Sequence, residues 1–513
     1  MTLFKAMATV GGLTGLSRIA GFIRDVLTAV ILGAGPVADA FFVALKLPNF
    51  FRKVTAEGAF SVSFVPKYSE VLEKDGDTHA DLFASRVFTL MFGILSLVAL
   101  LMMLIMPWVI FAIAPGFQGD PLRYDLAVEL SVITFPYLVL MSLTALMGGV
   151  LNARDRFGPF AAAPILFNLA LIAALLLSDF FETVGHAMAW GVIAAGILQF
   201  LWLALNIYRA RVALGLTVPR VTDNIREVLR RMGPGVIGAG VLQINLFADM
   251  IIASFLQAGA ISYLYYADRL NQLPLGVIGI AVGTALLPML SKTLAADRPE
   301  EARGLFNRAL EMCLLLGLPA AVALLIVPHI LIFTLFEYGA FTAEDTTITG
   351  YVLMGYAVGL PAYIGVKVLS SVFWAQGDTS TPVKIAIIAT CCNIILSLIL
   401  IQFLGVAGIT FATGLVGWLH YAHLNRLLPQ GMQYDDRLKG AALKIFAAAG
   451  GMGLFLIGFS IFSGALFTDA AGLLLNILGL IGMVLSGAGV YAALILALKV
   501  TSITEIKTYF RKT

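Results

Sequence analysis

The chain has 513 residues, of which 60% are hydrophobic and only 12% are charged, and its formal net charge is +3. A soluble globular protein carries about 25% charged residues. This composition therefore cannot form a surface that faces water, and it excludes a soluble protein. Backbone that faces lipid has to pair internally, so the apolar runs predict an all-α integral membrane protein with no room for a separate soluble domain.

Apolar runs of about 20 residues or more, long enough for a membrane-spanning helix, recur along the whole chain. We predict fourteen such helices, near residues 8–34, 37–69, 82–114, 125–151, 158–179, 184–209, 228–257, 262–293, 304–337, 346–376, 382–403, 405–428, 440–466 and 470–499. Arg18, Arg24 and Asp25 interrupt the first run, which also lacks the small-residue cleavage site of a secretory signal. We therefore expect this helix to remain in the mature protein.

Basic residues gather in alternate connections between these runs. The even-numbered connections and the tail hold Lys67, Lys74, Arg154, Arg156, Arg209, Arg211, Arg220, Arg226, Arg230, Arg231, Lys292, Arg298, Arg303, Lys384, Arg426, Arg437, Lys439, Lys507, Arg511 and Lys512. The odd-numbered connections hold a single basic residue, Arg123. The positive-inside rule then places both termini and every even connection in the cytoplasm of a multi-pass protein.

The sequence repeats itself at an offset of about 224 residues. Leu47-Pro48 corresponds to Leu273-Pro274, Pro66 to Pro288, and Asn168 to Asn393, in the same order in both copies. Each copy contains six predicted helices, so the two copies are parallel, and transport sites lie between such halves near the midplane. We predict a first lobe at 1–222, a second lobe at 223–430, and two additional helices with a cytoplasmic tail at 431–513.

Charged residues occur inside the predicted spans, where an arginine costs about 2.5–3.5 kcal/mol at the bilayer centre. The first two spans contain Arg18, Arg24, Asp25, Asp39, Lys46, Arg52, Lys53 and Glu57, and the second lobe contains Asp249, Asp268, Arg269 and Lys367. We expect these groups to face a hydrated cavity. The alternative is structural pairing, but neighbours such as Arg24 and Asp25 point in different directions on a helix.

Spacing places several of these groups on shared helix faces. Asp39, Lys46 and Lys53 are seven residues apart and stack on one face, with Asn49 near the same stripe. Arg18 and Arg24 are turned by roughly 120° from each other on a straight helix, so both line one cavity only if it is wide or the helix bends. The excess of cations predicts an anionic ligand, and a phosphate or diphosphate suits guanidinium groups.

Other kinds of site have little support in the sequence. Cys313, Cys391 and Cys392 match no disulfide or metal pattern, and the five histidines lack ligand spacing. Neither a nucleotide-binding loop nor a metal-ligand cluster is apparent, and nothing indicates nucleic-acid binding. The expected partners are membrane lipids and an anionic lipid-linked substrate, and we expect a monomer.

Six segments of the chain resemble the MurJ (MviN) family, within the MOP exporter superfamily. They are SRIAGFIRD at 17–25, DAFFVALKLPN at 39–49, AEGAFS at 56–61, FPY at 135–137, YYADRL at 265–270 and TPVK at 381–384. The resemblance covers essentially the whole chain and implies a flippase for lipid II, the undecaprenyl-diphosphate-linked peptidoglycan precursor. It implies alternating access between the two lobes, and a groove for the polyprenyl tail formed by the last two helices.

The resemblance also implies roles for individual residues. Arg18, Arg24, Arg52 and Arg269 would surround the headgroup, with Asp39, Asn49, Lys46 and Lys53 nearby. A sodium site known in relatives would map to Asp249, Asn393, Ser397 and Thr413. Ser397 stands where an acid is expected, so sodium coupling and coupling to the membrane potential alone both remain open.

Three other functions compete with this one. A flippase for another polyprenyl-diphosphate-linked oligosaccharide would share the fold and the cationic cavity. A multidrug cation antiporter would need an acidic cavity instead. A membrane glycosyltransferase would need a catalytic carboxylate in a large external loop, whereas Asp120, Asp125, Glu344 and Asp345 form no evident catalytic set.

Overall fold

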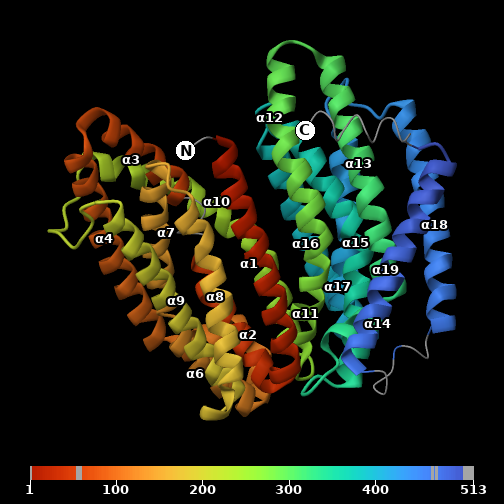
Figure 1. Cartoon of the computed structure of the whole chain (residues 1–513), viewed down its shortest axis with the longest axis horizontal. Coiled ribbons are helices and arrows are strands. Elements are labelled where there is room, and N and C mark those ends of the chain that lie inside the picture. The colour runs from red at the N-terminus through yellow and green to blue at the C-terminus, as the bar shows by residue number, and fades with distance from the viewer. Residues whose placement is uncertain (1–2, 53–59, 464–466, 468–471, 501–513) are drawn as a thin grey trace. The chain divides into compact units, whose positions relative to one another are not determined.

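The computed structural model describes residues 3–52, 60–463, 467 and 472–500, and the regular structure in these ranges is entirely helical (Figure 1). Within them, nine helical spans are long and apolar enough to cross a membrane. The prediction of an all-helical membrane protein is therefore confirmed.

The chain divides into two compact units. Unit 1 comprises residues 1–262 and 338–341, and unit 2 comprises residues 263–337 and 342–513. The helices of unit 1 are α1 (Leu3–Leu32), α2 (Pro36–Phe51), α3 (Ser61–Asp75), α4 (Asp77–Leu104), α5 (Met106–Ile113), η2 (Pro115–Gly119), α6 (Pro121–Thr134), α7 (Tyr137–Ala153), α8 (Gly158–Leu176), η3 (Ser178–Phe180), α9 (Val184–Arg209) and α10 (Asp223–Ser254). Thus α10 packs with unit 1, although it follows residue 222.

Unit 2 contains most of α11 (Ala260–Pro274) and the helices after it. These are the π-helix η4 (Leu275–Gly279), α12 (Ile280–Ala295), α13 (Pro299–Ile326), α14 (Pro328–Phe336), α15 (Ala343–Ala375), α16 (Ser380–Leu404), α17 (Ala407–Arg426), α18 (Asp436–Ser463) and α19 (Gly472–Ala497).

Each predicted span contains one, two or three consecutive helices of the described residues, and proline explains several of the divisions. Helix α5 carries Pro107 in its first turn, α7 follows Pro136, and α14 begins at Pro328. Proline lacks the backbone N–H that continues a helix but is well suited to its first turn. Apolar runs that read as single spans in the sequence therefore divide into two helices.

Stacked aromatic rings form a core in unit 1. The Phe64 ring lies 5.0 Å from Phe60, 5.8 Å from Tyr68 and 5.7 Å from Phe83, with nearly parallel planes. Residues of α7 such as Leu146 and Val150 complete this cluster. The stack joins α3 and α4 to α7. The span that contains α7 is the most deeply buried candidate membrane span of the unit.

Small residues let α15 and α17 approach closely at the centre of unit 2. A Cβ atom added to Gly359 would lie 2.6 Å from Cα of Gly414, and one added to Gly355 would lie 2.2 Å from Oγ1 of Thr410. Such small-residue contacts are typical of helix packing in membranes. Helices α18 and α19 pack on α13 and α14 through clusters around Ile445 and Met483.

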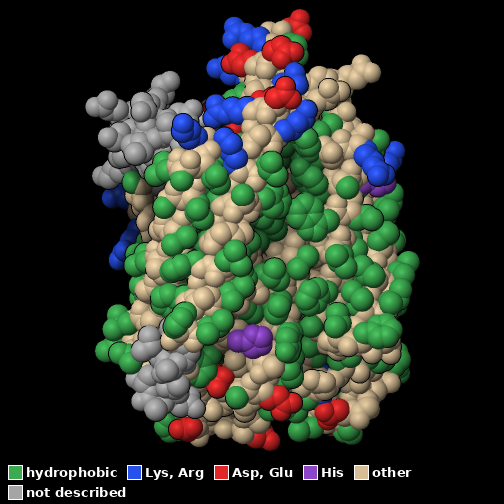
Figure 2. All heavy atoms as spheres, turned by 90° about the vertical axis from the view of Figure 1, so that its right-hand side faces the viewer, with side chains coloured by type: hydrophobic (Ala, Val, Ile, Leu, Met, Phe, Trp, Pro, Cys, Tyr) green, Lys and Arg blue, Asp and Glu red, His purple; other side chains and the backbone are tan. Residues whose placement is uncertain are grey.

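The face of unit 2 that carries α18 and α19 is apolar between two polar ends. Figure 2 shows a broad hydrophobic band, with lysines, arginines and acidic side chains gathered at one end and mainly acidic side chains visible at the other. Exposed leucines on α18 and α19, such as Leu443 and Leu485, contribute to the band. This is the surface that contact with lipid requires.

Candidate functional site

Arg24 is held in a fixed position inside unit 1. Its Nε and Nη2 donate to Oδ1 of Asp25 at 3.1 and 2.5 Å, and its Nη1 donates to Oδ1 of Asn168 at 2.8 Å. Asn168 on α8 in turn donates from Nδ2 to the carbonyl of Ser17 at 3.0 Å. The arginine is only 9% exposed. The protein therefore maintains the orientation of this guanidinium through contacts from both α1 and α8.

The Arg24–Asp25 pair corrects one sequence expectation. Neighbouring residues were expected to point apart on the helix, but the long arginine side chain folds back to reach the adjacent carboxylate. Gly21 also contributes, because a Cβ atom there would lie 3.4 Å from Nδ2 of Asn168. Arg18 lies on the same helix and is exposed. The structure thus gives the two arginines of α1 different surroundings.

The C-terminal part of α2 carries further predicted site residues. Arg52 donates from Nε to Oδ1 of Asn49 at 3.2 Å, and Asn49 donates to the carbonyl of Leu45 at 2.9 Å. Lys46, Asn49 and Arg52 are all half-buried. Lys53 lies outside the described residues. Asn49 therefore orients Arg52, which is a supporting role that its spacing from Lys46 did not indicate.

Asp39 is not exposed to any cavity, so the expectation that it faces water is wrong. Its side chain is fully buried, and Oδ2 accepts from Nη2 of Arg123 at 3.0 Å and from the N–H of Gly259 at 2.8 Å. Oδ1 accepts from the N–H and the hydroxyl of Ser262 at 2.9 and 2.7 Å. These contacts connect α2 to α6 and to the start of α11. Asp39 is a structural anchor.

Arg123 and Asn168 were missed as partners of these charges. Arg123 appeared in the sequence as the single basic residue of the odd-numbered connections, yet its guanidinium is buried and lies 4.2 Å from the centre of the Phe117 ring. Asn168 appeared as a repeated position corresponding to Asn393. A single basic residue among the odd-numbered connections and a repeated amide were the available signals.

In unit 2, Arg269 lies on α11 and is half-buried. Its guanidinium carbon is 4.6 Å from the centre of the Tyr265 ring, one helical turn earlier. Gln272 on the same helix donates a hydrogen bond to Asp268. Helix α11 ends at Pro274, and the π-helix η4 follows it. The arginine therefore lies shortly before a π-helical segment, and segments of this kind occur frequently at functional sites.

The residues of the expected sodium site are divided between the two units. Asn393 on α16 and Thr413 on α17 lie in unit 2, where Oγ1 of Thr413 is 3.3 Å from Oδ1 of Asn393. Ser397 is fully buried, and its hydroxyl makes no hydrogen bond. Asp249 lies on α10 in unit 1. Asn393 and Thr413 thus bring two neutral oxygens together in unit 2, and Ser397 follows Asn393 by four residues on α16. Neutral oxygens of this kind suit sodium.

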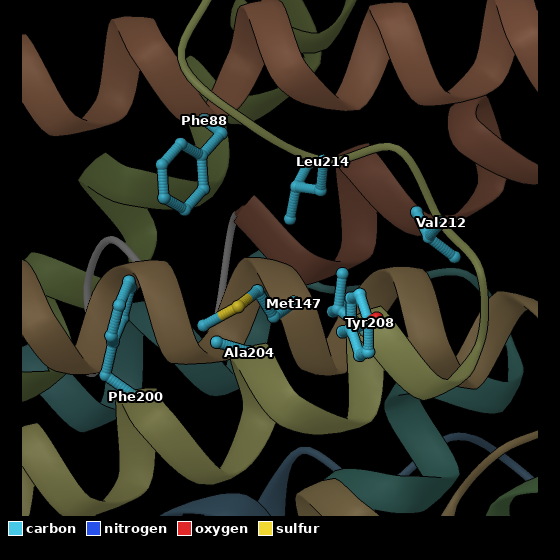
Figure 3. A pocket seen from close by; sticks show the side chains of 8 residues that line it. Phe88, Met147, Phe200, Ala204, Tyr208, Val212 and Leu214 are labelled. Carbon is cyan, nitrogen blue, oxygen red and sulfur yellow. The ribbon is translucent and has the colours of Figure 1, made fainter.

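An apolar pocket of about 180 Å³ lies in unit 1 between α4, α7, α9 and the segment after α9. Figure 3 shows Phe88, Phe200, Met147 and Leu214 around it. None of the predicted cationic residues lines this pocket. It suits hydrocarbon and not a headgroup.

Comparisons with known proteins agree on one family. A family model described as lipid II flippase MurJ matches residues 28–475. The probable lipid II flippase MurJ of Rhizobium tropici is 42% identical over 429 residues, 83% of this chain and 80% of that protein. The lipid II flippase MurJ of Burkholderia cenocepacia is 36% identical over 462 residues, 86% of this chain and 89% of that protein.

Solved structures agree with this result. A lipid II flippase MurJ in an inward closed conformation is similar with a TM-score of 0.79 at 29% identity, covering 96% of this chain and 98% of that one. An inward-facing multidrug resistance MATE transporter of the MOP superfamily has a TM-score of 0.68 at 14% identity, covering 80% and 94%. The second likeness is one of fold alone.

Proposed function

This chain belongs to the lipid II flippase MurJ family, and we infer from that membership that it carries lipid II from the cytoplasmic to the periplasmic leaflet of a bacterial inner membrane. It is a transporter of the MOP superfamily and not an enzyme. Its role is to supply the peptidoglycan precursor to the outer face of the membrane for cell-wall synthesis.

We propose that Arg24 binds the diphosphate of the substrate. The observation that carries this proposal is its fixed position, since Asp25 and Asn168 hold the guanidinium from two sides while some exposure remains. A guanidinium binds phosphate oxygens bidentately, and hydrogen bonds between charged groups are about twice as strong as neutral ones. Preorganisation of this kind reduces the entropy lost when the ligand binds.

Other cations of the two units complete the proposed headgroup site. Arg18, Arg52, Lys46 and Lys53 contribute from the first two predicted spans, Asn49 orients Arg52, and Arg269 contributes from the second unit. Asp39 is left out of the contact set, because its carboxylate already accepts hydrogen bonds from Arg123, Gly259 and Ser262. The proposed site is therefore more strongly cationic than the one inferred from sequence.

Alternating access is the proposed mechanism, with two parallel six-helix lobes at 1–222 and 223–430 and fourteen spans in all. Both termini lie in the cytoplasm in this proposal. Support comes from prolines at corresponding positions of the two lobes, since Pro48 lies inside α2 and Pro274 is the last residue of α11. The pair α18 and α19 would accommodate the polyprenyl tail.

Sodium is a proposed coupling ion. Asn393, Ser397 and Thr413 would supply neutral oxygens, and Asp249 would supply the charge. When bound, the ion would link transport to its own gradient. The buried hydroxyl of Ser397, which makes no hydrogen bond, supports this fit.

The test is complementation in bacteria depleted of their own lipid II flippase. The amount of lipid II accessible on the outer face is measured for the wild type, Arg24→Ala and Arg269→Ala at equal membrane abundance. The wild type should restore exposure of lipid II, and neither Arg24→Ala nor Arg269→Ala should restore it. The matched control is Arg226→Ala, which removes an arginine whose side chain is 74% exposed.

Two outcomes would contradict the proposal in different ways. If both arginine variants keep full transport, the diphosphate-binding assignment is wrong. If the correctly inserted wild type fails, the substrate is another polyprenyl-diphosphate-linked oligosaccharide, and the same assay is repeated with those lipids.

A further inference from the structure

Three side chains that can bind a metal ion converge in unit 1. Glu129 comes from α6, Glu182 from the segment before α9, and His186 from the first turn of α9. One ligand atom from each lies within 4.8 Å of the other two. The residues are separated by up to 57 positions in the sequence, which is why no ligand spacing was apparent.

His186 is oriented as metal-binding histidines are. The residue is 6% exposed, and its Nδ1 lies 2.9 Å from Oγ1 of Thr183. With Nδ1–H donating to that hydroxyl, Nε2 carries the lone pair. Nε2 is 3.3 Å from Oε1 of Glu129 but makes no hydrogen bond with it. A hydrogen bond from the second ring nitrogen is the usual device that fixes the tautomer and orientation of a ligating histidine.

The distance between Nε2 and the carboxylate fits a shared ion. Zinc bonds to imidazole nitrogen and carboxylate oxygen of about 2.0–2.2 Å in a tetrahedron place neighbouring ligand atoms about 3.3 Å apart. The observed separation of 3.3 Å already has this value. Glu182 is exposed, so its carboxylate is free to move the short distance that closes the third edge.

The local sequence explains why α6 and α9 meet at this point. Thr183 caps α9, and its hydroxyl accepts from the N–H of His186 at 3.3 Å. Gly185 allows close packing, because a Cβ atom there would lie 3.0 Å from Cδ1 of Leu130. Leu130 directly follows Glu129, and Gly185 directly precedes His186. The contact between Gly185 and Leu130 therefore sets the distance between His186 and Glu129.

We propose that Glu129, Glu182 and His186 form a zinc site, with solvent completing the coordination. Imidazole favours zinc over magnesium or calcium, which prefer oxygen ligands alone. The two carboxylates carry two negative charges beside a neutral imidazole, and a divalent cation balances them. Both glutamates are exposed, so the ion can enter from solvent. In the proposed topology this end of unit 1 faces the periplasm.

A zinc ion at this position would join the start of α9 to α6. An ion that binds the folded protein and not the unfolded chain raises the stability of the folded state by mass action. The site is thus a stabilising contact within unit 1, and occupancy by zinc outside the cytoplasm would stiffen this lobe. This inference does not depend on the identity of the transported lipid.

The test is zinc binding by the full-length, tag-free protein in detergent, measured by competition with a chromophoric chelator. The variants are Glu129→Gln and Glu182→Gln, which change two exposed side chains and preserve their size. Asp179→Asn is the matched control, since it removes an exposed carboxylate from the same connection outside the cluster. Wild type and control should bind one zinc ion per chain, and each glutamine variant should bind at least about tenfold more weakly.

Thermal unfolding gives a second measurement. Added zinc should raise the midpoint for wild type and Asp179→Asn, and much less for Glu129→Gln, Glu182→Gln and His186→Gln. Should His186→Gln fail to fold, the two glutamate variants still decide the matter. The absence of stoichiometric zinc in the wild type would overturn the proposal, as would zinc binding that neither glutamate variant weakens.

Discussion

Arg123 on α6 donates a hydrogen bond from Nη2 to Oδ2 of Asp39 on α2 at 3.0 Å, and both side chains are buried. The remaining hydrogen bonds to this carboxylate come from Gly259 and Ser262. Backbone and side chain donors from two separate segments therefore converge on one buried charge. Asp39 holds the N-terminal half of α2 in place. The cations in the C-terminal half of α2 take no part in this contact.

Arg123→Ala is expected to destabilise the protein strongly. Removing one partner of a buried ion pair costs about 3–5 kcal/mol, because the other charge stays buried. The measurement is the free energy of unfolding in detergent. Arg226→Ala is the control, since it breaks an exposed pair with Asp223 at 3.3 Å and should cost about 1 kcal/mol or less. Equal stability of the two variants would show that the buried pair contributes little.

The sequence predicted where the helices lie, but it did not predict all of the points at which one helix ends and the next begins. The apolar runs overlap every α-helix of the described residues, because bilayer thickness and backbone pairing impose length and apolarity directly. Divisions such as that before Pro328 were missed, since the flanking residues are equally apolar. Arg24 and Arg269 could be proposed as site residues because a charge inside an apolar run is conspicuous.

The contact partners of these side chains could not be predicted from the sequence in the same way. Arg123 and Asp39 are 84 residues apart, and the pairing depends on how α2 and α6 pack. His186 and Glu129 meet only because Gly185 allows α9 to approach Leu130. One local expectation also failed, since the Arg24 side chain is long enough to reach Asp25 despite the direction of its Cβ.

Gly339→Ala should destabilise unit 1. Gly339 has a φ of +61°, and a Cβ atom there would lie 2.4 Å from the carbonyl oxygen of Val30. This short segment docks on the end of α1, where the N–H of Ala340 donates to Val30 at 2.8 Å. Left-handed backbone alone costs a residue with a side chain about 1–2 kcal/mol, and the contact adds to that cost.

The control for this prediction is Gly35→Ala. Gly35 has an extended φ of 175°, and a Cβ atom there would meet nothing within 4 Å. Both variants are compared with wild type by thermal unfolding. A midpoint for Gly339→Ala that matches Gly35→Ala would show that the segment can move away from α1 without loss.

Acid should weaken the connection between α3 and α10. Lys67 lies 2.8 Å from Oε2 of Glu227, and this hydrogen bond lowers the pKa of Glu227 from its ordinary value of 4.5. A carboxylate with a lowered pKa contributes stability above its unfolded pKa and loses it as the pH falls through the folded value. The thermal midpoint of Glu227→Gln should therefore be below that of wild type near pH 7, and the gap should close below about pH 4.

Glu73→Gln is the control for the acid effect. Glu73 lies on α3 and is exposed. Its substitution by glutamine changes the net charge by the same amount as Glu227→Gln. Its midpoint should follow that of wild type at both pH values. A gap for Glu227→Gln that persists in acid would mean that the amide disturbs packing instead of removing the ion pair.

Transport should depend on the shape of Arg24 and on Asn168 as well as on charge. Arg24→Lys keeps the charge but loses the planar fork that binds two phosphate oxygens. A hydrogen bond to a charged group contributes about 1.5–3 kcal/mol, so transport should fall by about 10–100-fold. Asn168→Asp should be at least as harmful, because a second carboxylate beside the guanidinium would compete with the diphosphate. Asn168→Ala, which leaves the Arg24–Asp25 pair intact, should cost less.

Asn206→Ala is the matched control for the two Asn168 variants, since Asn206 donates to the carbonyl of Trp202 within its own helix. All variants are compared by the amount of lipid II exposed on the outer face at equal membrane abundance. If Asn168→Asp transports as well as Asn168→Ala, added negative charge beside Arg24 does not matter, and the guanidinium cannot be the group that binds the diphosphate. The expected order is Asn206→Ala above Asn168→Ala, with Arg24→Lys and Asn168→Asp lowest.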